Sequence, residues 1–78
     1  MTYRLVIPGR LDIAQLADLV AVSEAYSAER ERSMEGASTF RDGRVYHSGA
    51  PQMVARVSYN GKVWAPEEGG ALLFNPYA

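Results

Sequence analysis

LDIAQLADLVAVSEAYSAERERSMEG, residues 11–36, decides the fold because it holds the longest helical pattern in the chain. Asp12 followed by Gln15 fits a capping box, in which the aspartate accepts from a free helix N–H and the glutamine reaches back to the cap. Apolar and small side chains then recur at helical spacing, and Gly36 is a typical C-terminal stop. These signals predict one long helix from residue 13 to residue 34 or 35.

Strand patterns flank this predicted helix on both sides. Residues 2–7 alternate between two faces and end at Pro8-Gly9, which predicts one strand before the helix. After the helix, Asp42-Gly43 and Asn60-Gly61 each separate two runs of period two, the sequence signal of a hairpin with a type I′ turn. A further turn is expected at residues 48–51. The expected strands after the helix cover residues 38–41, 44–47, 53–59 and 62–65.

The two predicted hairpin turns also set a register. A two-residue loop at Asp42-Gly43 would place Arg41 opposite Arg44. A two-residue loop at Asn60-Gly61 would place Val57 opposite Trp64. The side chains expected to share the face of Val57 are Met53, Ala55, Tyr59 and Trp64, and those expected on the other face are Val54, Arg56, Ser58 and Val63.

The predicted element order is β-α-β-β-β-β. This order indicates an α+β fold, with one long N-terminal helix packed on a mostly antiparallel sheet. The chain of 78 residues is long enough for one small domain spanning residues 1–78. Residues 71–78 (ALLFNPYA) form a C-terminal tail that is too apolar to stay free, so we expect it to fold back on the domain or to meet a partner.

Composition excludes several classes of site. The chain has 8 Lys and Arg against 9 Asp and Glu, a formal net charge of −1, and no cysteine. Without cysteine there is no disulfide, zinc–thiolate site, iron–sulfur cluster or thiol nucleophile. No run approaches the roughly 20 apolar residues needed to span a bilayer, and no secretory leader is visible. We therefore expect a cytoplasmic protein that does not bind membranes.

No set of residues able to catalyse a reaction is visible. The single histidine, His47, lies in a predicted strand and is interpreted as structural. Ser48 follows it directly and points the opposite way, so the two do not form a nucleophile–base pair. Metal-ligand spacings and glycine-rich phosphate loops are also missing. We expect a protein that is not an enzyme and that uses no cofactor and no metal.

Charge is unevenly distributed along the chain. Residues 12–35 carry six acidic and two basic side chains, a net charge of −4, whereas residues 41–62 carry four basic and one acidic, a net charge of +3. Arginine and tyrosine on a strand face are typical of protein interfaces. Two candidate partner-binding patches follow: a sheet patch of Arg41, Arg44, Tyr46 and Arg56, and a helix patch of Glu24, Glu29, Glu31 and Glu35.

A small α+β chain with a polarised surface and no catalytic set resembles, in size and type, the phage-encoded anti-CRISPR inhibitors. The resemblance implies a stoichiometric blocker that docks on a CRISPR surveillance complex or nuclease. In that case the acidic helix would mimic nucleic-acid phosphates, or the arginine patch would hold an acidic surface of the partner.

Two other functions are open. The first is a nucleic-acid- or carbohydrate-binding module in which Tyr46, Tyr59 and Trp64 stack on the ligand. The small net charge argues against nucleic acid. The second is a self-associating structural protein, a homodimer joined through its apolar tail or its sheet edges.

Overall fold

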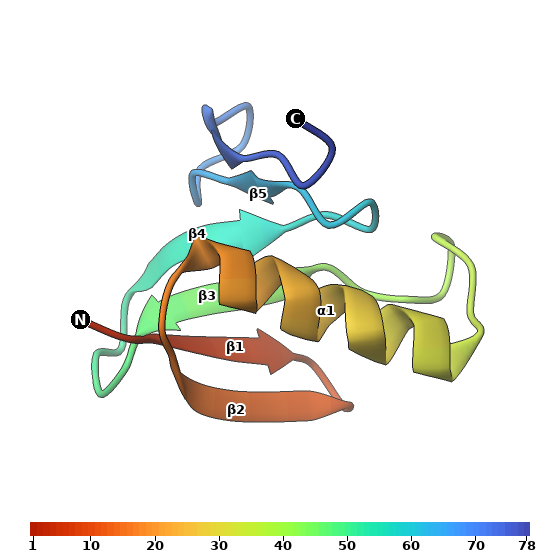
Figure 1. The fold of residues 1–78 in the computed structure, drawn as a ribbon, viewed down its shortest axis with the longest axis horizontal. Helices are drawn as coiled ribbons and strands as arrows, with labels where there is room; N and C mark the ends of the chain where they lie inside the picture. Colours follow the sequence, from red (N-terminus) through yellow and green to blue (C-terminus); the bar gives the residue numbers. More distant parts are fainter.

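The computed structural model describes residues 1–78 and contains one helix and one six-stranded sheet (Figure 1). The strands lie in the order β2-β1-β3-β4-β5-β6, and every neighbouring pair is antiparallel. Figure 1 shows the helix lying across one face of this sheet. The elements are β1 (Tyr3–Ile7), β2 (Leu11–Leu16), α1 (Leu19–Ser33), β3 (Gly43–His47), β4 (Met53–Val57), β5 (Val63–Trp64) and β6 (Leu72–Phe74).

The predicted fold class is confirmed, since one helix packs on an antiparallel sheet. The predicted order is wrong, because two strands precede the helix and the chain runs β-β-α-β-β-β-β. The helix is therefore the third element, not an N-terminal one. It is also shorter than predicted, at 15 residues.

The error arises in residues 11–16, which form β2, whereas Asp12 was predicted to cap a helix that began at residue 13. Gly9, at a φ of 76°, and the hydrogen bond from the Arg10 N–H to the Ile7 carbonyl make a tight turn that folds the chain back onto β1. Leu11 then lies opposite Ile7, and Ile13 lies opposite Leu5. Pairing of these apolar side chains across two strands outweighs the local capping-box signal.

The helix begins one turn and a half later than predicted, at a different aspartate. Asp18 has an extended backbone, and its carboxylate accepts from the Ala21 N–H at 2.8 Å, which makes it the N-cap. Asp12, the predicted cap, lies in β2 instead. At the other end the helix stops at Met34, whose φ of 58° is left-handed, so Gly36 is not the residue that ends it.

Replacing Asp18 with alanine should lower the free energy of unfolding by about 1 kcal/mol, because a helix N–H loses its acceptor. Urea unfolding followed by circular dichroism measures this loss. Glu24→Ala is the matched control, since that exposed carboxylate caps no helix and has no ion-pair partner. A loss from Glu24→Ala as large as that from Asp18→Ala would contradict the assignment of the cap.

The core lies between the helix and one face of the sheet. Tyr26 and Val22 of α1 are fully buried against the strands, and Phe40 of the following loop closes one end of the core. The sheet contributes Leu5, Ile7, Val45, Ala55, Val57 and Val63.

The predicted strand at residues 38–41 and its Asp42-Gly43 hairpin are wrong. Residues 36–40 turn instead, with the Phe40 N–H donating to the Gly36 carbonyl at 3.0 Å, and Gly43 is the first residue of β3. Burial of the Phe40 ring holds this loop against the core. β3 then pairs with β1 and β4, so Arg41 does not lie opposite Arg44.

A turn forms at Asn60-Gly61 as predicted, but it is not the predicted type I′ turn, because Asn60 has no positive φ, and the strand register is shifted by one residue. The Ser58 N–H donates to the Lys62 carbonyl at 3.0 Å, so the loop has three residues, with Gly61 at a φ of 86°. Val57 consequently faces Val63, and Trp64 faces Arg56. A slip of one residue exchanges the two faces of a strand, which places Val63 in the core and Trp64 on the opposite face.

The C-terminal tail folds back on the domain, which is one of the two outcomes expected for it. β6 pairs with β5 at the edge of the sheet, and the Tyr77 hydroxyl donates to the Asn60 carbonyl at 2.8 Å.

The chain's helix lacks the length and the apolar character needed to cross a bilayer.

Candidate functional site

The sheet face opposite the helix carries one row of side chains that crosses all six strands. Arg44 of β3 lies opposite Val6 of β1 on one side and opposite Arg56 of β4 on the other. Arg56 in turn lies opposite Trp64 of β5. In spatial order the row is Asp12, Val6, Arg44, Arg56, Trp64 and Leu72.

A second, shorter row lies beside the first, where Arg4 of β1 faces Tyr46 of β3. Together the two rows place three arginines and two aromatic rings on the side of the sheet away from α1. We call this surface the arginine face and define it as Arg4, Arg44, Tyr46, Arg56 and Trp64.

Arg4 is fixed within this surface by a neighbouring carboxylate. Its Nε and Nη2 donate to the two oxygens of Asp12 at 2.8 Å and 2.6 Å, a bidentate pair. These hydrogen bonds hold the pKa of the Asp12 carboxyl below its usual range and raise the pKa of Arg4. The Arg4 guanidinium also lies over the Tyr46 ring, 5.6 Å from its centroid.

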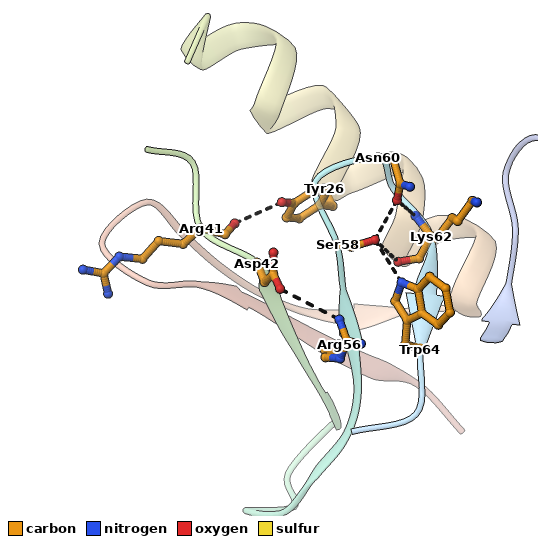
Figure 2. Close-up of polar contacts among 8 residues, drawn as sticks. All are labelled: Tyr26, Arg41, Asp42, Arg56, Ser58, Asn60, Lys62 and Trp64. Carbon is orange, nitrogen blue, oxygen red and sulfur yellow. Dashed lines mark hydrogen bonds and ion pairs between the residues drawn. The ribbon is translucent and has the colours of Figure 1, made fainter. Parts of the chain in front are cut away.

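Trp64 is held by the loop that precedes it. Its Nε1 donates to the Ser58 hydroxyl at 2.9 Å, and that hydroxyl donates to Asn60 Oδ1 at 2.6 Å (Figure 2). The Arg56 guanidinium lies over the indole ring, 5.5 Å from its centroid. The ring and the arginine are therefore both positioned by contacts within the protein.

A pocket of about 240 Å³ opens at the end of the arginine face where β3 begins. Arg44 and Arg56 line it together with Arg41, Asp42 and Pro8. The Asp42 carboxylate lies 3.9 Å from Arg56 Nη1, and Figure 2 shows the Arg41 side chain extending away from Arg56.

The structure brings most of the predicted sheet patch together. Arg44, Tyr46 and Arg56 project from adjacent strands on the same face. Arg41 lies in the loop before β3, where its carbonyl accepts from the Tyr26 hydroxyl at 3.0 Å. It reaches the patch only at the edge of the pocket.

The four glutamates of the predicted helix patch do not form one exposed acidic patch. Glu29 is buried and accepts from Arg32, and Glu35 lies past the helix end and pairs with Arg10. Glu24 and Glu31 are exposed, and Glu31 lies 4.0 Å from Arg30.

Sequence reasoning missed two members of the arginine face. Arg4 shares a strand face with Val6 in the alternating pattern of residues 2–7, so its direction was readable from the sequence. The pairing of Arg4 with Asp12 was not readable, because Asp12 was assigned as the cap of a helix that began at residue 13. Trp64 was assigned to the opposite face because the predicted two-residue loop placed it opposite Val57, whereas it lies opposite Arg56.

His47 lies apart from this surface, at the end of β3. Its ring stacks on Tyr3, with the centroids 5.2 Å apart, and its Nδ1 is buried without a hydrogen-bond partner. No group of three or more His, Asp or Glu side chains is arranged to hold a metal ion.

The fold and this surface together define a small α+β protein with a preformed arginine and aromatic face on an open antiparallel sheet. No protein-family model matches the chain, and neither the curated proteins nor the solved structures gave a significant match.

Proposed function

We propose that the protein is a non-enzymatic binding module that uses the arginine face to hold an acidic surface of a protein partner. The observation that carries this proposal is the direct cross-strand pair of Arg44 and Arg56 on a sheet face that no helix covers. Like charges placed opposite each other cost stability, and an acidic partner would remove that cost. Arginine with aromatic neighbours is also the composition of interface hot spots.

The same surface favours a protein partner over single-stranded nucleic acid. Nucleic-acid binders of this kind need open aromatic faces on which bases stack. Here the Tyr46 ring lies beneath Arg4 and the Trp64 ring lies beneath Arg56. The net charge of −1 also gives no general attraction for a polyanion.

We propose further that the partner is a CRISPR surveillance complex or nuclease, which the protein would block by occupying its surface. This step rests on the resemblance in size and type to anti-CRISPR inhibitors. Cleavage of target DNA by a panel of purified CRISPR effector complexes, with and without the protein, tests it. If every complex in the panel cleaves at an unchanged rate, this identification of the partner fails, and the partner must be sought by affinity capture from host cells.

Reversing the charge of both central arginines, Arg44→Glu with Arg56→Glu, should weaken binding to the partner by about 100-fold or more, because two hot-spot contacts become repulsive. Affinity is measured by biolayer interferometry, and a thermal melt checks that the variant is folded. The matched control reverses two exposed acids on the helix, Glu24→Lys with Glu31→Lys, and should leave the affinity unchanged.

The two variants separate the candidate surfaces. Full affinity in the arginine variant overturns the proposed use of the arginine face. Loss of affinity only in the glutamate variant would assign binding to the helix.

A further inference from the structure

The seven arginines of the chain fall into two groups. Four of them are bound by the fold: Arg4 by Asp12, Arg10 by Glu35, Arg30 by the Tyr59 carbonyl, and Arg32 by Glu29. The other three, Arg41, Arg44 and Arg56, donate no side-chain hydrogen bond to any group of the protein. These three are the arginines that line the pocket at the start of β3.

The missing hydrogen bonds matter most for Arg56. Its side chain is only 29% exposed, and the nearest carboxylate, that of Asp42, is 3.9 Å away. That distance is too long for a hydrogen bond. Arg44 lies directly opposite on β3 and pairs with no carboxylate. The pocket therefore holds two adjacent guanidinium groups whose donors are unused within the protein.

The charge of the pocket indicates its ligand. Three guanidinium groups and the single carboxylate of Asp42 give a net charge of +2. A phosphate monoester carries a charge of about −1.5 to −2 at neutral pH and three acceptor oxygens. A carboxylate or a phosphodiester carries only one negative charge. The planar guanidinium fork also matches phosphate oxygens in pairs.

We propose that this pocket binds a dianionic phosphate group, presented by a phosphorylated side chain on the partner. The inference rests on the proposed function, because it names the group on the partner that the arginine face holds. Arg44 and Arg56 bind the phosphate from the sheet. Arg41, which is exposed in the loop before β3, supplies the third positive charge at the edge of the pocket.

The size of the pocket supports a side-chain head group as the occupant. Sites that enclose a whole small molecule measure about 300–1,000 Å³. At about 240 Å³, the pocket has room for a phosphate and the atoms next to it but does not enclose a nucleotide.

The first test uses small probes and nuclear magnetic resonance of the arginine Nε–H groups. The probes are inorganic phosphate, N-acetyl-phosphoserine amide, its glutamate counterpart, and a thymidine trinucleotide that carries only phosphodiesters. Both phosphate probes should shift the Arg44 and Arg56 signals and bind about tenfold more tightly than the glutamate probe, since a second charge is neutralised. Arg44→Gln with Arg56→Gln should abolish this preference. Lys62→Gln, which removes a positive charge with no ion-pair partner at the β4–β5 turn, should keep it.

Three results would overturn the inference: equal affinity for the glutamate and phosphoserine probes, tighter binding of the trinucleotide, or a phosphate preference that survives the double glutamine substitution.

The second test treats the partner with phosphatase before binding, which should lower its affinity for the protein by about tenfold or more. If phosphatase leaves the affinity unchanged but the charge-reversal variant loses affinity, the phosphate group is not what the pocket binds. The arginine face would then still be the binding surface.

Discussion

Replacing Tyr26 with alanine is expected to remove much of the protein's stability. The side chain is fully buried between α1 and the sheet, and its ring packs edge-on against Phe40 with the centroids 5.4 Å apart. Truncating a buried aromatic ring to alanine costs about 3–5 kcal/mol. A chain of 78 residues has a total stability of only about 4–12 kcal/mol. Urea unfolding followed by circular dichroism measures the loss.

Tyr26→Phe separates the ring from its hydroxyl. It keeps the packing and loses only the hydrogen bond to the Arg41 carbonyl, so the expected loss is about 1 kcal/mol. An equal loss in the two variants would contradict the assigned role of the ring.

The raised pKa of the Tyr26 hydroxyl makes the free energy of unfolding depend on pH. Burial, with a smaller effect from the Asp42 charge, raises the pKa of Tyr26 to about 12, whereas an unfolded tyrosine titrates near 10. The unfolded state therefore loses its proton first, and stability should fall as the pH rises from about 10 to about 12. Tyr26→Phe should remove the part of this fall that Tyr26 causes.

Replacing Gly43 with valine should cost about 3 kcal/mol, at the upper end of the usual range for overpacking a core. Gly43 is buried at the start of β3, opposite Val57. A Cβ atom there would lie 2.8 Å from Leu5 Cδ1 and 3.0 Å from Tyr26 Cδ2, closer than carbon atoms pack. Both neighbours are fully buried, so neither moves without disturbing the core.

Gly36→Val is the matched control for Gly43→Val. A Cβ atom at Gly36 meets no heavy atom within 4 Å, and the backbone there has no left-handed φ. We expect a change within about 0.5 kcal/mol, as for other surface substitutions. Similar losses at the two positions would contradict the assigned role of the close approach of Leu5 and Tyr26 at residue 43.

The fold class was predictable from local patterns because both turn signals and strand alternation are properties of short segments. The strand at Tyr3–Ile7 and the turn at Asn60-Gly61 depend on such patterns. The strand at Leu11–Leu16 does not, because an aspartate three residues before a glutamine looks the same in a strand as in a capping box. Only its pairing with β1, a contact made through the turn at Gly9, decides between the two structures.

The candidate site was likewise predictable only where it depends on short local patterns. Alternation placed Arg44 and Tyr46 on one strand face, and the structure keeps them there. Loop length decided the position of Trp64, and an Asn-Gly pair does not distinguish a two-residue loop from a three-residue loop. Burial of Glu29 follows from how the helix packs, which no pattern of charges along the helix reveals.

Within β3 and β4, the side chains of consecutive residues lie on opposite faces of the sheet. Val45 and Ala55 face the helix and hold the domain together, whereas Arg44 and Arg56 face outward and contribute little to the core. Substitutions at the outward positions can therefore accumulate without loss of folding. The chemistry of the outward face is in this way uncoupled from the packing that maintains the architecture.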